Sequence, residues 1–176
     1  MRWEALFDDL EAQLAAIELA DRAAVVGELT RAERATVRLD GRLRAAVGAL
    51  LTVRIRGGEQ LAGELVDAAS EWILLAEGPR RYLVPSHALA VVRGLTGLVE
   101  PDGGTVLRSL GLGHALRALS RDRVAVRISA RGSEIRGRID AVSADHVDVV
   151  ALDETGRGLA ERWTVPLAAI DVVAST

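Results

Sequence analysis

The sequence contains no cysteine, no lysine and no asparagine, and aromatic residues make up 3% of its 176 positions. Without cysteine there can be no disulfide framework, thiolate nucleophile or zinc–cysteine centre. Without lysine the chain cannot form a Schiff base or supply the lysine of a P-loop. All 22 basic residues are therefore arginine. These absences exclude several enzyme classes without naming an activity.

Charge and hydropathy narrow the class of protein further. The formal net charge is −3 at pH 7 and the isoelectric point is near 5.7, whereas non-specific polyanion binders are usually basic. No apolar run approaches the about 18 residues that span a bilayer. The first residues are acidic, where a signal peptide would be basic. We therefore expect a cytoplasmic protein without a membrane partner, built as one ordinary domain or two very small ones.

The first segment has the period of an amphipathic helix. Its apolar residues recur on one helical stripe, which comprises Trp3, Phe7, Leu10, Leu14 and Ile17. A second, alanine-rich helical stretch covers residues 21–36. We expect residues 1–40 to form a helical arm. Its stripe would pack either on the chain's own domain or on a second copy, as a self-association surface.

An internal repeat organises the rest of the chain. The matches fall at apolar, glycine and proline positions, which set the backbone path and the core. The aligned pairs include Leu43–Ala45 with Leu116–Ala118, Val53–Ile55 with Val126–Ile128, Gly63 with Gly137, Tyr82 with Trp163, Val84–Pro85 with Val165–Pro166, and Val91–Val92 with Val172–Val173. We expect one copy at residues 41–98, a turn-rich linker at 99–113 and a second copy at 114–176.

Each copy has the alternation of β-strands. Val124, Val126 and Ile128 alternate with more polar residues, which predicts one buried face and one wet face. Glycines near residues 56–58 and 130–132 indicate hairpin turns. Gly63 and Gly137 fall within strands, where glycine marks a bend or a close backbone approach.

Three further strands complete each copy. We expect third strands at residues 72–76 and 147–151, fourth strands ending at Pro85 and Pro166, and fifth strands at 89–92 and 170–173. Five short, strongly bent strands can cover their edges by closing on themselves. The predicted fold class is α+β, mostly β, with a helical arm followed by two five-stranded small barrels.

This order of elements resembles the Sm-like (LSm) fold. A short helix (residues 43–47 and 114–119) precedes strands reading V-x-I-x-x-G-x-x-L-x-G-x-L, then V-P-x-x-A and a last short strand. The resemblance implies an Sm-like barrel for each copy, and other small SH3-like barrels fit the same pattern. The whole chain is also similar to uncharacterised actinobacterial proteins that begin M-R-W-x-x-L-F-x-D-L-E, some of them labelled transcriptional regulators.

The RNA pocket of Sm proteins does not carry over to this chain. Those proteins resemble one another in an Asp/Asn-bearing loop after strand two and an Arg-Gly loop after strand four. Residues 67–70 and 141–144 contain no asparagine, and residues 85–87 and 166–168 contain no Arg-Gly. The resemblance therefore implies a fold and not a ligand site.

Histidines and carboxylates form no catalytic or metal-binding pattern. His87, His114 and His146 lack metal-ligand spacing. The segment at residues 111–113 lacks the third glycine of a dinucleotide loop. The paired acids at residues 145/148 and 153/154 are expected to be solvated. We expect no catalytic residue, no cofactor and no metal.

The arginines of the second copy are the best candidates for binding. Alternation predicts that Arg123, Arg127, Arg136 and Arg138 share one outward face, where guanidinium groups can grip phosphates. Tyr82 and Trp163 could add a stacking surface. The plainer interpretation is a set of solvated or ion-paired arginines.

Two functional hypotheses follow from the sequence. The first is a non-enzymatic interaction or scaffold protein that binds itself, as a dimer or higher oligomer, or another protein through edge strands. The alternative is an RNA- or DNA-binding regulator that uses the arginine face. An enzyme is the least favoured class, because no base, nucleophile or ligand set emerges.

Overall fold

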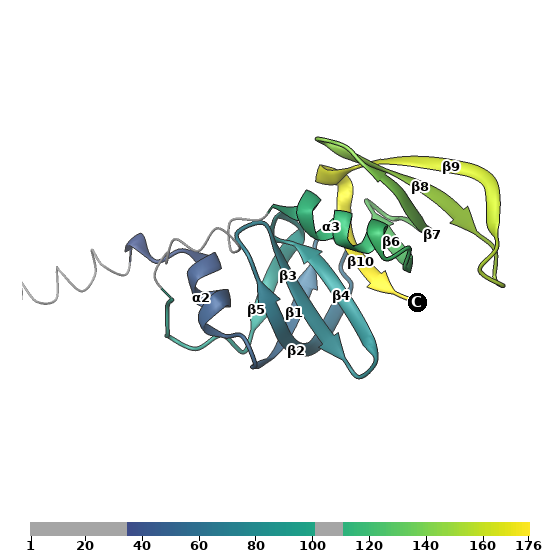
Figure 1. The fold of residues 1–176 in the computed structure, drawn as a ribbon. Helices are drawn as coiled ribbons and strands as arrows, with labels where there is room; N and C mark the ends of the chain where they lie inside the picture. Colours follow the sequence, from purple (N-terminus) through teal and green to yellow (C-terminus); the bar gives the residue numbers. More distant parts are fainter. Residues whose placement is uncertain (1–34, 101–110) are drawn as a thin grey trace, which may run out of the picture. The chain divides into compact units, whose positions relative to one another are not determined.

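The structure is a computed structural model that describes residues 35–100 and 111–176 (Figure 1). The predicted self-association stripe, Trp3, Phe7, Leu10, Leu14 and Ile17, lies outside these ranges, as does the turn-rich part of the predicted linker. Residues 39–176 belong to one structural unit. The helices in the described ranges lack the length and apolar character needed to cross a membrane.

The described residues of this unit are mostly β-strand. In chain order the elements are α2 (Leu39–Ala45), β1 (Leu50–Ile55), β2 (Gln60–Ala68), β3 (Trp72–Glu77), β4 (Arg80–Pro85), the 3₁₀ turn η1 (Ser86–Ala88), β5 (Leu89–Arg93), α3 (Leu112–Arg121), β6 (Ala125–Ala130), β7 (Ser133–Val142), β8 (His146–Leu152), β9 (Gly158–Pro166), the 3₁₀ turn η3 (Leu167–Ala169) and β10 (Ile170–Ser175).

All ten strands join one open antiparallel sheet, in the order β5-β1-β2-β3-β4-β10-β6-β7-β8-β9. The prediction of two closed five-stranded Sm-like barrels is wrong. A closed first barrel would need β4 to pair with β5, but β4 pairs with β10, with Leu83 opposite Val173 and Tyr82 opposite Ala174. The backbone groups on the free side of β4 are thus met by a distant strand of the same chain, so the sheet continues and leaves β5 and β9 as its edges.

The strands on either side of this junction contribute side chains to two cores. On β10, Val172 and Ala174 pack in the core of the first five strands, whereas Val173 packs in the core of the second five. On β4, Tyr82 belongs to the first core and Leu83 to the second. Because successive strand residues point to opposite faces, the β4–β10 junction interlocks the cores without a separate interface.

Much of the local pattern in the sequence is confirmed. The third, fourth and fifth strands lie where their alternation places them, and Pro85 and Pro166 end β4 and β9. Gly58 and Gly132 adopt left-handed φ values of 86° and 83° in the hairpin turns. Helix α2 begins and ends earlier than predicted, whereas α3 contains the predicted segment. The internal repeat and the domain boundaries stay predictions.

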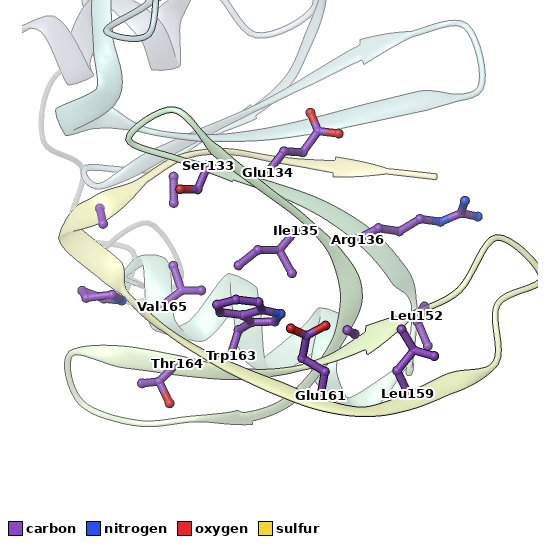
Figure 2. A pocket seen from close by; sticks show the side chains of 14 residues that line it. Ser133, Glu134, Ile135, Arg136, Leu152, Leu159, Glu161, Trp163, Thr164 and Val165 are labelled. Carbon is purple, nitrogen blue, oxygen red and sulfur yellow. The ribbon is translucent and has the colours of Figure 1, made fainter.

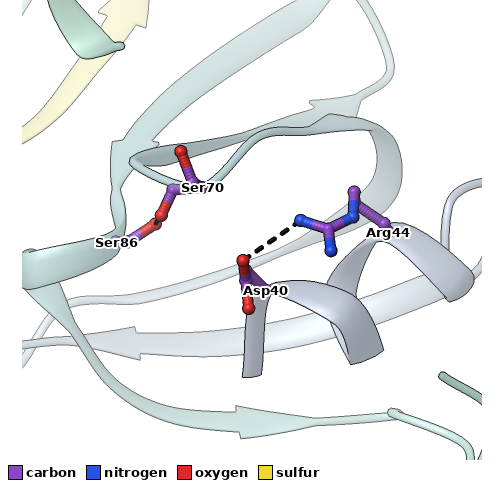
Figure 3. A network of polar contacts seen from close by, with 4 residues as sticks. All are labelled: Asp40, Arg44, Ser70 and Ser86. Atoms are coloured by element: carbon purple, nitrogen blue, oxygen red, sulfur yellow. Dashed lines mark hydrogen bonds and ion pairs between the residues drawn. The ribbon is translucent and has the colours of Figure 1, made fainter. Parts of the chain in front are cut away.

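The helices and turns are fixed by short polar contacts. In α2, Asp40 and Arg44 form an ion pair one turn apart, with 3.1 Å between Oδ2 and Nη1 (Figure 3). The Ser86 hydroxyl in η1 donates to the backbone carbonyl of Ser70 at 3.1 Å. At α3, the amide of Leu112 donates to the Glu71 carboxylate at 2.8 Å, which satisfies one of the unpaired donors that begin a helix.

A buried carboxylate reinforces the junction of the two halves. Asp171 on β10 is 4% exposed. It accepts a hydrogen bond from the amide of Arg131 at 2.6 Å and lies 3.6 Å from the guanidinium of Arg56. A ring nitrogen of His87 lies 3.0 Å from the carbonyl of Ile170. These contacts join residues far apart in the sequence and leave Asp171 fully partnered, as a buried charge requires.

Gly63 and Gly137 are confirmed as points of close backbone approach. A β-carbon at Gly63 would lie 2.3 Å from the carbonyl oxygen of Ala76. At Gly137 it would lie 2.4 Å from a methyl group of Val149 and 2.6 Å from the carbonyl oxygen of Val150. Both glycines therefore let neighbouring strands cross at a distance that no other residue allows.

We expect Gly63→Ala to lower the free energy of unfolding by about 1–3 kcal/mol, because strand β3 must shift to admit the methyl group. Urea titration followed by circular dichroism measures this loss. Gly57→Ala is the matched control, since a β-carbon at Gly57 meets nothing within 4 Å. Equal losses in the two variants would contradict the close-approach interpretation.

Candidate functional site

Four arginines gather on one face of the sheet beside the β4–β10 junction. Strand pairing places Arg127 directly opposite Arg136, and Ala125 opposite Arg138. Arg127 also lies opposite Ala174, which lies opposite Tyr82. Arg80 is two residues before Tyr82 on β4 and so shares its face. We call Arg80, Arg127, Arg136 and Arg138 the arginine ledge.

The ledge carries little neutralising charge of its own. Two acids lie beside it: the Glu134 carboxylate is 3.7 Å from the guanidinium of Arg127, and Glu77 lies directly opposite Arg80 in the pairing of β3 with β4. Among the residues that the structure describes, Arg80, Arg136 and Arg138 have no carboxylate within ion-pair distance. Guanidinium groups that face each other across paired strands repel one another.

A groove of about 360 Å³ runs across the ledge. Its lining includes Arg80, Arg127 and Arg136, together with the small residues Ala174 and Ser175 of β10. The small β10 side chains separate the strand that carries Arg80 from the strands that carry the other arginines. The walls of the groove are therefore three guanidinium groups and the carboxylate of Glu134, and its floor is made of short side chains.

Tyr82 lies at one end of this groove and is fixed in place. It is 4% exposed, and its hydroxyl donates to the Glu77 carboxylate at 2.8 Å. Burial raises the pKa of Tyr82, the bond to Glu77 acts in the same direction, and Arg80 opposes both. A ring so buried offers no open surface for stacking a base.

The structure separates the remaining predicted contacts from the ledge. Arg123 adopts a φ of 52° in the turn between α3 and β6, outside the paired strands. Trp163 lies opposite Val149, which belongs to the second core, so it occupies the other face of the sheet from Arg138. Arg127, Arg136 and Arg138 are brought together as alternation predicts. Arg80 joins them only through the β4–β10 pairing, which no local sequence signal specifies.

Trp163 lines a second hollow, of about 540 Å³, on the core side of strands β6 to β9. Figure 2 shows Trp163 and Ile135 close to one another, with Glu161 beside them and Arg136 extending away. Ala130 and Val165 also line this hollow. Trp163 is 46% exposed, so a large apolar surface is left partly open to water.

The hollow opens along an edge strand. Strand β9 pairs with β8 on one side and ends the sheet on the other. Eight of its nine residues are exposed, and Val165 is buried. The opposite edge, β5, pairs with β1 and exposes Val91, at 58%.

The histidines and carboxylates considered in the sequence make contacts with nearby residues or face solvent. His146 lies 2.7 Å from the Asp145 carboxylate, a contact that lowers the pKa of Asp145. Asp148 accepts the hydroxyl hydrogen of Thr164 at 2.7 Å. His114 is exposed on α3. Within residues 35–100 and 111–176, no three potential ligands cluster in a way that could hold a metal ion.

Asp153 organises the turn that leads into β9. Its carboxylate accepts hydrogen bonds from the Thr155 hydroxyl at 2.7 Å and from the amide of Arg157 at 2.9 Å. These bonds favour the ionised form and lower the pKa of Asp153.

No protein-family model and no curated protein matches this chain. The resemblance to Sm-like proteins therefore stays a prediction, and the functional argument depends on the geometry of the chain itself.

We expect the turn at Asp153 to stay ordered at neutral pH and to loosen as the pH falls through the lowered pKa of this carboxyl, because protonation removes its acceptor charge. Amide chemical shifts of Thr155 and Arg157, followed by NMR during acid titration, should move together with the Asp153 carboxyl. In Asp153→Asn this shared transition should disappear. If it persists, another group controls the turn.

Proposed function

We propose that the protein acts by binding rather than catalysis, as a scaffold that self-associates head to tail through its two edge strands. Strand β5 of one copy would add to β9 of the next and extend the sheet. The observation that carries this proposal is the open hollow beside β9. The corresponding side of β4 is covered by β10.

The β4–β10 junction provides the template for the proposed contact. There, β10 adds to β4 and inserts Val172 and Ala174 into the first core, against Tyr82. At β9, Trp163 and Ile135 line a hollow that no strand of the described chain covers. An added strand with outward apolar side chains would bury these residues and pair the free backbone groups of β9.

Strand β5 has the side chains that this hollow requires. In the predicted repeat, Val91 aligns with Val172, Arg93 with Ala174 and Trp163 with Tyr82. The same pairing would insert Val91 into the hollow and place Arg93 opposite Trp163. Val91 is paired with Arg54 on β1, and Arg93 is paired with Thr52. The β5 edge is thus an exposed valine flanked by arginines.

Charge complementarity favours a second copy of the chain as the occupant. Glu161, Glu134 and Arg136 line the hollow around the apolar centre, so its charged lining has one more acid than base. The arginines beside Val91 would face these acids once β5 adds to β9. Opposite charges at the rim set the register of such a contact and add modestly to its strength.

Because β5 and β9 are different surfaces, a pair of copies joined by one β5–β9 contact still has a free β5 at one end and a free β9 at the other. Such a heterologous contact makes closed rings where the rotation between copies closes, and open filaments where it does not. This distinguishes the proposal from a symmetric dimer, which would consume identical surfaces.

We expect Val91→Asp and Trp163→Glu each to abolish self-association, because each puts an unpaired charge into the contact. Burying such a charge costs about 3 kcal/mol or more, which weakens association by about a hundredfold. Sedimentation velocity and light scattering would follow the loss. Val66→Asp is the matched control, because Val66 is an exposed valine on the internal strand β2.

Mixing the two variants tests the head-to-tail geometry directly. The intact β9 of Val91→Asp can accept the intact β5 of Trp163→Glu, so the mixture should form a one-to-one dimer and nothing larger. Formation of that dimer also shows that both variants are folded. A monomeric wild-type chain, or a mixture that stays monomeric, would overturn the proposal.

A charge exchange tests the register of the contact. We expect Glu161→Arg and Arg93→Glu each to weaken association by about twofold to fivefold, since a rim ion pair contributes about 0.5–1 kcal/mol. The double variant should regain the affinity of the wild type, measured as the concentration dependence of sedimentation. Additive losses in the double variant would place the two residues apart.

A further inference from the structure

The arginine ledge needs its own explanation, although Arg136 and Glu134 line both its groove and the hollow beside β9. It lies in the middle of the sheet, over β4, β10, β6 and β7, whereas the proposed self-association uses β5 and β9. The inference below therefore does not depend on the proposed function.

The chain itself neutralises the charges of Arg127 and Arg136 only weakly. Arg127 and Arg136 are directly opposite in register, with β-carbons about 5 Å apart in such a pair. Glu134 reaches Arg127 at 3.7 Å, and its side chain is 61% exposed, so it neutralises one charge of the group weakly. An anion seated between Arg127 and Arg136 would remove the repulsion that the bare sheet maintains.

Phosphate is the anion that this geometry suits best. The planar guanidinium group donates two parallel hydrogen bonds to the oxygens of one phosphate, and two opposed guanidinium groups can hold one phosphate between them. Arginine is the basic residue at every position of the ledge. The groove of about 360 Å³ is open enough to admit such a group from solvent.

The spacing of the ledge indicates more than one phosphate. Arg80 lies on β4, two strands from Arg127 on β6, with β10 between them. Strands are about 4.8 Å apart, and Arg80 is two residues along β4 from Tyr82, which is level with Arg127. The separation of Arg80 from Arg127 is therefore about 12 Å, more than twice that of Arg127 from Arg136. The side chains of Ala174 on β10 and of Thr176 just after it, which share this face, occupy the interval, which leaves room for a chain of phosphates above them.

We infer that the arginine ledge is a binding site for closely spaced phosphate groups, with one phosphate held between Arg127 and Arg136 and a further one reached by Arg80. The phosphates can belong to a compact phosphorylated ligand or to a nucleic-acid backbone. Two observations favour the compact ligand: the net charge of the chain is −3, and Tyr82, the aromatic residue of the groove, is too buried to stack a base.

Inorganic tripolyphosphate and orthophosphate are the probes for the first arm of the test. Isothermal titration calorimetry should show tripolyphosphate binding to the full chain, more tightly at low than at high salt. We expect Arg127→Gln/Arg136→Gln to weaken this binding by about tenfold or more, because it removes the charged donors on both sides of one phosphate. Arg80→Gln should weaken tripolyphosphate binding and leave orthophosphate binding unchanged.

Arg117→Gln/Arg121→Gln is the matched control, since it removes the same charge from exposed positions on α3. A single-stranded RNA oligonucleotide forms the second arm. Binding of RNA without tripolyphosphate, lost in Arg127→Gln/Arg136→Gln, would support the phosphate site and identify a nucleic-acid backbone as its source. Absence of binding to both probes, or equal losses in the ledge and control variants, would overturn the inference.

Discussion

The pairing of β4 with β10 is the constraint on which the rest of the molecule depends. It joins Tyr82 and Leu83 to Val173 and Ala174, and so connects strands that are far apart in the sequence. It turns two groups of strands into one sheet, sends neighbouring side chains into different cores, and brings Arg80 to the arginines of β6 and β7. Without this pairing, neither the groove over β10 nor the contrast between a covered β4 and an open β9 would exist.

Local features of the fold could be read from the sequence because they have local causes. Alternation placed the strands, proline ended β4 and β9, and glycine marked both the turns at Gly58 and Gly132 and the close crossings at Gly63 and Gly137. Closure into barrels could not be decided in this way. An exposed edge strand can be covered by several partners. The pairing of β4 with β10 depends on the side chains that β10 buries, and these residues are far from β4 in the sequence.

The same distinction between local and long-range causes applies to the residues of the candidate sites. The shared face of Arg127, Arg136 and Arg138 follows from strand period and a hairpin register, so the sequence could indicate it. Arg80 reaches this face through a long-range pairing, and Trp163 is placed on the opposite face by its register with Val149. To decide whether Trp163 shares a face with the arginines, one must know which face of β9 packs on the core. The residues of β9 are largely exposed and show no clear alternation, so the sequence does not tell.

A strand whose successive residues belong to different cores also determines how the molecule comes apart. Withdrawing β10 from the second core removes Val173 and Ile170, and the same movement uncovers Tyr82 by taking away Val172 and Ala174. Neither half can therefore melt while the other keeps its packing intact. Although the order of the strands suggests two similar halves, residues 39–176 form one cooperative unit. Its thermal unfolding should proceed as one transition.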